Sequence, residues 1–78
     1  MQKQISAGAI YWHYKNHPIR VIGIAHHSET KEELVIYEKL ADGDGFKKGS
    51  LWARPKGMFL EDIIVNGKKM PRFALIKE

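Results

Sequence analysis

Two short polar segments carry the side chains whose types could do chemistry. The first is His26-His27-Ser28-Glu29-Thr30, and the second is Trp52-Ala53-Arg54-Pro55. Together they hold imidazole, hydroxyl, carboxylate, indole and guanidinium groups, in a chain that is otherwise rich in apolar, strand-forming residues and turns. A guanidinium beside an indole can bind a phosphate or carboxylate while the ring stacks on a flat ligand. The two segments therefore predict a binding site for an anionic or planar ligand.

A third segment contributes to the predicted site through Tyr37, which lies in an apolar run. The predicted ligand-binding residues are His27, Ser28, Glu29, Tyr37, Trp52 and Arg54. In this hypothesis Arg54 holds the anionic part of the ligand, and Trp52 and Tyr37 supply stacking surface. The residues around His27 form the rim. No residue is given a catalytic role, and no cofactor is expected.

These residues also have a purely structural interpretation. The hydroxyls of Ser28 and Thr30 can bond to nearby backbone amides and shape a turn. Arg54 can instead form an internal salt bridge with Glu29 or Glu38, as surface arginines often do. The sequence leaves both interpretations open.

The four histidines do not predict a metal site. His26 and His27 are neighbours in an extended segment, so their side chains point to opposite faces and cannot easily share one ion. The chain has no cysteine that could add a thiolate ligand. Only His13 together with His27 forms a pair worth testing.

Hydrolytic chemistry is disfavoured because His27 directly precedes Ser28. A base in that position cannot reach the hydroxyl without strain, and no glycine-rich nucleophile turn surrounds the pair. An acid or base role for His27, oriented by Glu29, is the enzymatic alternative. We favour a non-enzymatic binding module and leave the enzyme question undecided.

The charge is unevenly distributed along the chain, whose formal net charge is +4. Residues 45–60 contain four cations and no acid, whereas residues 29–38 contain four glutamates and one lysine. Basic side chains around Trp52 favour nucleic acid or an acidic protein as the partner. The alternative is a protein or peptide interaction module that accepts an added strand at a sheet edge. The oligomeric state is not predicted.

The chain shows no sign of a membrane or secretory role. Its apolar runs are far shorter than the roughly 20 residues of a membrane-spanning helix. The first residues lack a continuous hydrophobic stretch of the kind that marks a signal peptide. With no cysteine, a reducing, cytoplasmic location is expected.

Strand and turn signals alternate along the chain. Strands are expected at residues 8–14, 19–27, 34–40, 51–54, 63–65 and 68–73, with a helical turn at 56–60 that buries Met58 and Phe59. Gly23 would permit a bend in the second strand, which is apolar on both faces and is expected to be covered on both. Asn66-Gly67 predicts a type I′ hairpin turn.

These elements predict one all-β domain over residues 1–78. It would be a small, strongly bent, antiparallel SH3-like barrel of five or six short strands with one short helical turn. Residues 41–49, which contain Asp42-Gly43-Asp44-Gly45, would form a long loop.

Six ordered blocks of the sequence resemble one known family. The blocks are Tyr11-Trp12-His13-Tyr14-Lys15, Ile22-Gly23-Ile24-Ala25-His26-His27-Ser28-Glu29-Thr30, Val35-Ile36-Tyr37, Trp52-Ala53-Arg54-Pro55, Met58-Phe59-Leu60-Glu61 and Asn66-Gly67-Lys68-Lys69-Met70-Pro71-Arg72-Phe73. The family is a bacterial domain of unknown function, number sixteen fifty-three. The resemblance runs from about residue 8 to residue 73 and implies an SH3-type small barrel, but no activity.

The family pattern is similar at most positions of the predicted site. The matching positions are His13, His27, Ser28, Glu29, Thr30, Tyr37, Trp52, Arg54, Pro55, Met58 and Phe59. Three departures stand out: His26 replaces the family's usual arginine, Asn16 replaces a usual glycine, and residues 41–49 make a longer loop. The first departure argues against a permanent charge at His26.

Overall fold

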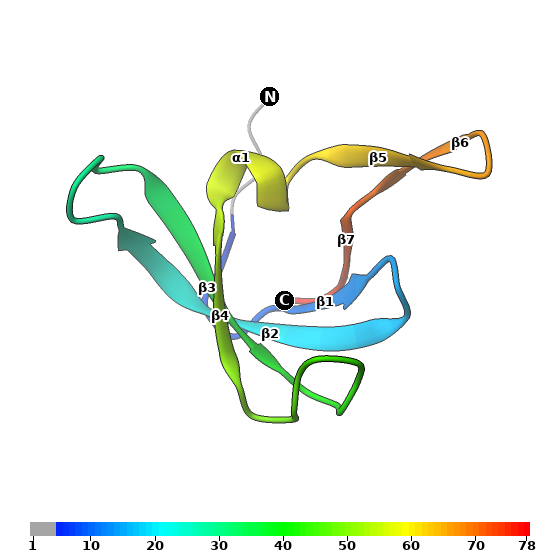
Figure 1. Ribbon diagram of the computed structural model, residues 1–78, viewed down its shortest axis with the longest axis horizontal. Helices are drawn as coiled ribbons and strands as arrows, with labels where there is room; N and C mark the ends of the chain where they lie inside the picture. Colours follow the sequence, from blue (N-terminus) through cyan, green and yellow to red (C-terminus); the bar gives the residue numbers. More distant parts are fainter. Residues whose placement is uncertain (1–4) are drawn as a thin grey trace.

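A computed structural model describes residues 5–78, which form seven strands and one short helix (Figure 1). In chain order these are β1 (Ile10–His13), β2 (His17–His26), β3 (Glu33–Lys39), β4 (Leu51–Pro55), α1 (Lys56–Phe59), β5 (Asp62–Val65), β6 (Lys68–Pro71) and β7 (Phe73–Lys77). The expectation of an all-β protein with one helical turn is therefore confirmed.

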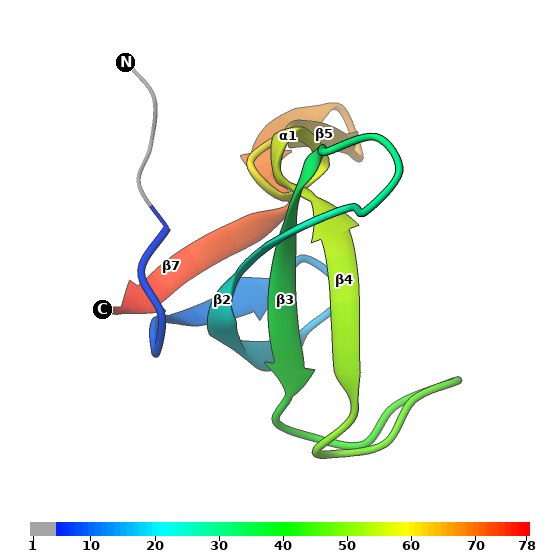
Figure 2. The same cartoon turned by 90° about the vertical axis from the view of Figure 1, so that its left-hand side faces the viewer.

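Five strands form one antiparallel sheet in the order β4-β3-β2-β1-β7, and β5 pairs with β6 in a separate hairpin. Figure 1 shows this hairpin projecting to one side of the sheet. Figure 2 shows β3 and β4 side by side, with the loop of residues 40–50 joining their lower ends. The sheet has two edge strands, β4 and β7.

The core lies on the inner face of the sheet beneath α1. Phe59 is the buried residue of α1 and stacks on Phe73 of β7, with ring centroids 4.2 Å apart. Tyr11 meets Phe59 edge-on at 5.1 Å, and Tyr37 meets Phe73 in a similar way at 5.5 Å. Three aliphatic side chains complete this face: Ile19, Val21 and Val35. A single helical turn thus closes the core.

Two local signals in the sequence are confirmed, the bend at Gly23 and the turn at Asn66-Gly67, and Asn16 also adopts a turn conformation. Asn16 has a φ of 70° in the turn before β2, a conformation that asparagine tolerates better than most residues. The β2–β3 register shifts between Val21 and Gly23, which is the irregularity expected of a bent strand. Asn66 and Gly67 both have positive φ between β5 and β6, as a type I′ turn requires.

Two burial predictions were wrong. Met58 is 45% exposed, because the single turn of α1 directs only Phe59 into the core. The second strand is not covered on both faces either: Ile22 and Ile24 are 46% and 37% exposed. Both isoleucines lie at or beyond the register shift in β2, where the strand leaves the core.

The expected last strand is two strands. β6 ends at Pro71, the chain bends at Arg72, and β7 then pairs with β1. The backbone N–H of Arg72 donates to the Glu61 carbonyl, and the Arg72 carbonyl accepts from Tyr14, both at 3.0 Å. Arg72 thus links the hairpin to the large sheet.

None of the described helices is long and apolar enough to span a membrane.

Candidate functional site

Three of the six predicted site residues lie together on the inner face of the sheet. Tyr37 pairs with Trp52 in the β3–β4 register, and Arg54 pairs with Val35 one step further along. Directly opposed residues of antiparallel strands share a face, so Trp52 and Arg54 lie on the side where Tyr37 and Val35 are buried. Trp52 remains 41% exposed and can reach a ligand.

The other three predicted residues occupy the exposed turn between β2 and β3. His27 Nδ1 accepts hydrogen bonds from the backbone N–H groups of Glu29 and Thr30, at 3.1 and 3.3 Å. The Ser28 hydroxyl donates to Glu29 Oε2 at 3.1 Å. Within residues 5–78, the side-chain hydrogen bonds of His27, Ser28 and Glu29 stay inside this turn, which matches the structural interpretation. Among residues 5–78, no side-chain hydrogen bond or ion pair joins the turn to Arg54 or Trp52.

A buried lysine stands beside the Tyr37–Trp52 pair. Lys39 is the last residue of β3 and is only 6% exposed. Its Nζ atom lies 4.2 Å from the ring centroid of Phe46, 5.3 Å from Trp52 and 5.6 Å from Tyr37. Its polar side-chain contact is to His17 Nε2, at 2.9 Å. Three aromatic rings and one imidazole therefore surround the ammonium group.

Two stacked histidines extend this group of residues toward Arg54. The rings of His13 and His17 are 4.4 Å apart, and His13 meets Phe73 edge-on at 4.9 Å. The Arg54 guanidinium lies 5.5 Å from the Phe73 ring centroid. We call the whole set the cation–aromatic cluster; its members are His13, His17, Tyr37, Lys39, Phe46, Trp52, Arg54 and Phe73.

Burial and the repulsion of nearby cations push His13, His17 and Lys39 toward their neutral forms. Burial lowers the pKa of His13 to about 4, with further lowering by His17, Lys39, Arg54 and Lys15. Burial also lowers the pKa of His17, as do Lys39 and Lys15. The pKa of Lys39 falls below its ordinary value through burial and then through Arg54. Near neutral pH both imidazoles are uncharged.

Neither Lys39 nor Arg54 has a carboxylate partner within residues 5–78. The ion pairs found there join Lys56 to Glu33, Lys69 to Asp62 and Arg72 to Glu61. The alternative in which Arg54 forms a salt bridge with Glu29 or Glu38 is therefore not observed among the described residues. A desolvated cation without a counter-charge is energetically costly, and a bound anion would relieve that cost.

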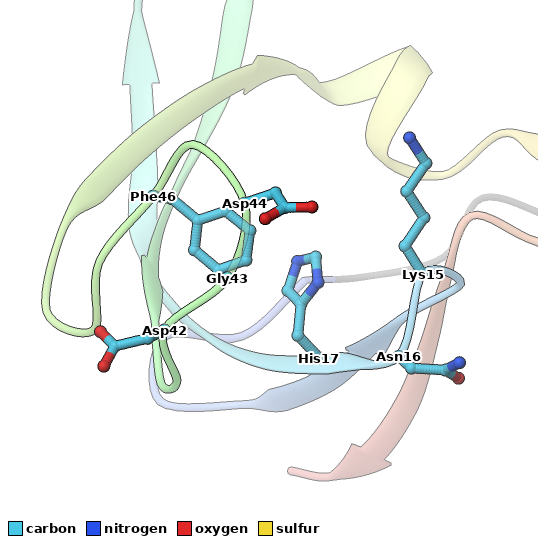
Figure 3. A pocket seen from close by; sticks show the side chains of 7 residues that line it. All are labelled: Lys15, Asn16, His17, Asp42, Gly43, Asp44 and Phe46. Atoms are coloured by element: carbon cyan, nitrogen blue, oxygen red, sulfur yellow. The ribbon is translucent and has the colours of Figure 1, made fainter.

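A pocket of about 330 Å³ adjoins the cluster where the loop of residues 40–50 approaches the β1–β2 turn. Figure 3 shows His17 between Phe46 and Lys15, with Asp44 on the loop side and Asn16 pointing away. His17 and Phe46 thus face this pocket on one side and contact Lys39 on the other.

The described residues contain no group of three or more acidic or histidine side chains able to hold a metal ion.

The model of the family described as "Protein of unknown function (DUF1653)" matches residues 9–75. The chain belongs to the DUF1653 family. Among solved structures, this DUF1653 protein is similar to the crystal structure of a family member from Bordetella bronchiseptica, with a TM-score of 0.80 and 27% identity. That match covers 95% of this chain and 90% of the other. No curated protein matches the sequence.

Sequence reasoning missed the two residues at the centre of this DUF1653 site. Lys39 alternates with the inward-facing Val35 and Tyr37, so its position on the buried face follows from the period of two along β3. His17 lies between the strands expected at residues 8–14 and 19–27 and has no predicted role. The His17 ring belongs to the cluster because the β1–β2 register pairs His17 with His13, on which its ring stacks.

The conformation of Phe46 depends on Gly43, and this gives a first prediction. A Cβ atom at Gly43 would lie 2.2 Å from Cζ of the Phe46 ring, so Gly43→Ala must displace the ring. We expect this substitution to separate Phe46 from Lys39 and His17. Chemical shifts of the His17 ring, measured by NMR, should change strongly in Gly43→Ala. They should hardly change in Gly57→Ala, where an added Cβ meets no atom within 4 Å and φ is not positive. Unchanged His17 shifts in Gly43→Ala would contradict the predicted displacement.

Proposed function

We propose that this protein is a non-enzymatic binding module that recognises single-stranded nucleic acid through the cation–aromatic cluster. The observation that carries the proposal is the pair Lys39 and Arg54, two inward-facing cations without a carboxylate partner in the described part of the chain. Both flank Trp52, which is 41% exposed. Cations that track phosphates and an aromatic ring that stacks on bases are the two elements of single-strand recognition.

Charge supports a polymeric anion over a small neutral ligand. Basic residues continue on both sides of β4: Lys47 and Lys48 are exposed in the preceding loop, and Lys56 follows the strand. A polyanion lying along β4 would meet these side chains in turn. The indole N–H of Trp52 donates to the Ser50 hydroxyl at 2.9 Å, which holds the ring in place for stacking.

We also infer that the fold is an SH3-like small barrel. The bent strand β2 and the pairing of β1 with both β2 and the C-terminal β7 support this inference. The helical turn α1, placed between β4 and β5, closes the core as expected of such a barrel. This arrangement leaves the inner face of β4 available to a ligand near Trp52.

The test is a fluorescence titration in which Trp52 is the only tryptophan. The chain has two tryptophans, so Trp12→Phe serves as the background variant. Short single-stranded DNA and RNA are added at low and at physiological salt. We expect quenching at low salt that weakens steeply as salt increases, because phosphate contacts release counterions. Absence of any response at low salt would contradict the proposal.

Charge-neutralising variants locate the site. Arg54→Gln should weaken binding roughly 10- to 100-fold, the value of one desolvated, charge-assisted contact. The matched control is Arg20→Gln, since Arg20 is exposed on β2 between the buried Ile19 and Val21 and so lies on the other face. It should weaken binding by no more than about threefold through the change in net charge. Equal losses in both variants would show that only overall charge matters.

A protein or peptide interaction module is the second candidate function. The observation in its favour is that β4 is an edge strand of the large sheet and can accept an added strand. An extended peptide would then pair with β4 beside Trp52. A titration response that hardly changes with salt would favour this function over nucleic acid.

A further inference from the structure

The side of the large sheet that points away from the core is apolar. We call it the outer face; in β1–β4 it is formed by the strand residues that lie between those facing the core. An antiparallel sheet with one buried face normally carries polar side chains on its other face. Here most outward positions are apolar, and they include Ile10, Trp12, Ile22, Ile36, Leu51 and Ala53.

Much of this apolar surface is open to solvent. Leu51 is 64% exposed at the β4 edge, and Ile22 and Trp12 are each at least 40% exposed. With strands about 4.8 Å apart and roughly 20 Å long, the outer face of β1–β4 covers roughly 400 Å². Apolar patches of this size on a small protein are often binding surfaces.

Two charged residues lie on the outer face of β1–β4, and they oppose each other at its centre. Arg20 pairs with Glu38 in the β2–β3 register. No ion pair joins them within residues 5–78, although opposite charges at such positions commonly interact. One cation beside one anion is a pattern that complements itself after a half-turn. A polyanion on this face would instead meet the Glu38 carboxylate.

We propose that a second copy of this chain packs on the outer face, around a two-fold axis that runs between β2 and β3 along the strands. The half-turn lays β2 of one copy over β3 of the other, so Arg20 meets Glu38 of the second copy, twice in the dimer. It also lays Ile10 over Leu51, because these residues flank Arg20 and Glu38 in one cross-strand row. Ile22 lies over Ile36 in the same way, since its neighbour Gly23 pairs with Ile36. Apolar side chains therefore meet apolar side chains, and each charge meets its opposite.

The size of this interface predicts a reversible dimer. Apolar surface leaves water on both copies, and the two Arg20–Glu38 contacts fix their relative orientation. The total area of roughly 800 Å² is small for a specific interface and suits exchange between monomer and dimer. The cation–aromatic clusters lie on the inner faces and stay open in the dimer. This inference is therefore independent of the proposed function.

Sedimentation velocity of the full chain tests the pairing. We expect the wild type to be mainly dimeric at about 100 µM and to dissociate on dilution. Arg20→Glu and Glu38→Arg should each weaken dimerisation at least about 30-fold, because symmetry places like charges together twice. Ile22→Glu should have a similar effect. Its matched control is Ile64→Glu, since Ile64 is an exposed residue of β5 outside this face, and this variant should dimerise like the wild type.

Mixing the two charge variants distinguishes pairing of two copies from a role within one copy. Arg20→Glu carries two acids at the centre of the face and Glu38→Arg carries two bases, so one copy of each restores opposite charges at both contacts. We expect the equimolar mixture to form a heterodimer, and the double variant Arg20→Glu/Glu38→Arg to dimerise alone. Urea denaturation verifies that each variant is folded.

Three results would overturn the inference. A monomeric wild type at about 100 µM would leave the outer face to a different protein. Dimers that persist in Ile22→Glu and in both charge variants would place the interface elsewhere. Folded charge variants that stay monomeric when mixed would show that Arg20 and Glu38 do not meet across a two-fold axis.

Discussion

Phe59→Ala is expected to lower the free energy of unfolding by about 3–5 kcal/mol, the usual cost of truncating a buried phenylalanine. Phe59 is 1% exposed and stacks on Phe73, and it contacts Tyr11 and Tyr37 as well. A chain of this size has a total stability of only about 4–12 kcal/mol. Urea denaturation followed by circular dichroism at 25 °C should show the midpoint shifted to a much lower urea concentration.

Met58→Ala is the matched control for this prediction. Met58 precedes Phe59 in the same helical turn, but it is 45% exposed. Its truncation should cost less than about 1 kcal/mol. If both variants lost similar stability, the cost would come from helix formation, and the core assigned to Phe59 would be wrong.

Acidification is expected to destabilise the fold through His13. The folded pKa is about 4 and the ordinary value is 6.5, so in between the unfolded chain binds a proton that the folded chain does not. Stability is therefore complete above about pH 6.5 and falls as the pH decreases to about 4. The free energy of unfolding should fall by about 2 kcal/mol. This is less than the whole pKa shift of His13 would give, because water partly screens the ring. His17, whose pKa is also lowered, adds to this loss of stability.

His13→Asn tests the assignment of this pH dependence. The asparagine oxygen can accept the hydrogen bond that Lys15 donates to His13 Nδ1, at 3.1 Å, but the side chain does not titrate. The variant should be less stable at pH 7 because it loses the ring contacts with His17 and Phe73. Its stability should fall less steeply between pH 6.5 and pH 4 in urea titrations. A slope equal to that of the wild type would assign the effect to other groups.

Local structure could be predicted from the sequence because its determinants are local. Asn66-Gly67 predicts the β5–β6 turn, since few other residue pairs adopt positive φ at both positions. The alternation of apolar residues predicts β3 and its buried face, with Tyr37 inward. Gly23 predicts the bend of β2 for a similar steric reason. In each case neighbouring residues decide the conformation.

Long-range pairing could not be predicted in this way. The separation of β7 from β6 depends on two backbone hydrogen bonds, from the Arg72 N–H to the Glu61 carbonyl and from the Tyr14 N–H to the Arg72 carbonyl, which no sequence period encodes. The same holds for the candidate site. Trp52 and Arg54 join Tyr37 through the β3–β4 register, whereas Lys39 and His17 meet only when the β1–β2 hairpin folds against β3.

The predicted turn residues are a case in which chemical variety does not distinguish a ligand-binding loop from a structural turn. His27, Ser28 and Glu29 attracted a ligand-binding hypothesis because of their chemical variety, but their hydrogen bonds form the turn itself. Polar residues at a turn satisfy backbone groups first. Whether the turn also contacts a ligand depends on its distance from β4, which the chain order does not reveal.

The exposed edge at β4 carries a consequence for self-association. Free edges of sheets can pair with another chain and start aggregation, and short length, charge and proline oppose this. β4 spans only five residues and ends in Arg54 and Pro55, with Lys56 directly after it. The cations proposed to attract a polyanion would thus also repel a second copy of the same edge, so recognition and resistance to aggregation would share one set of charges.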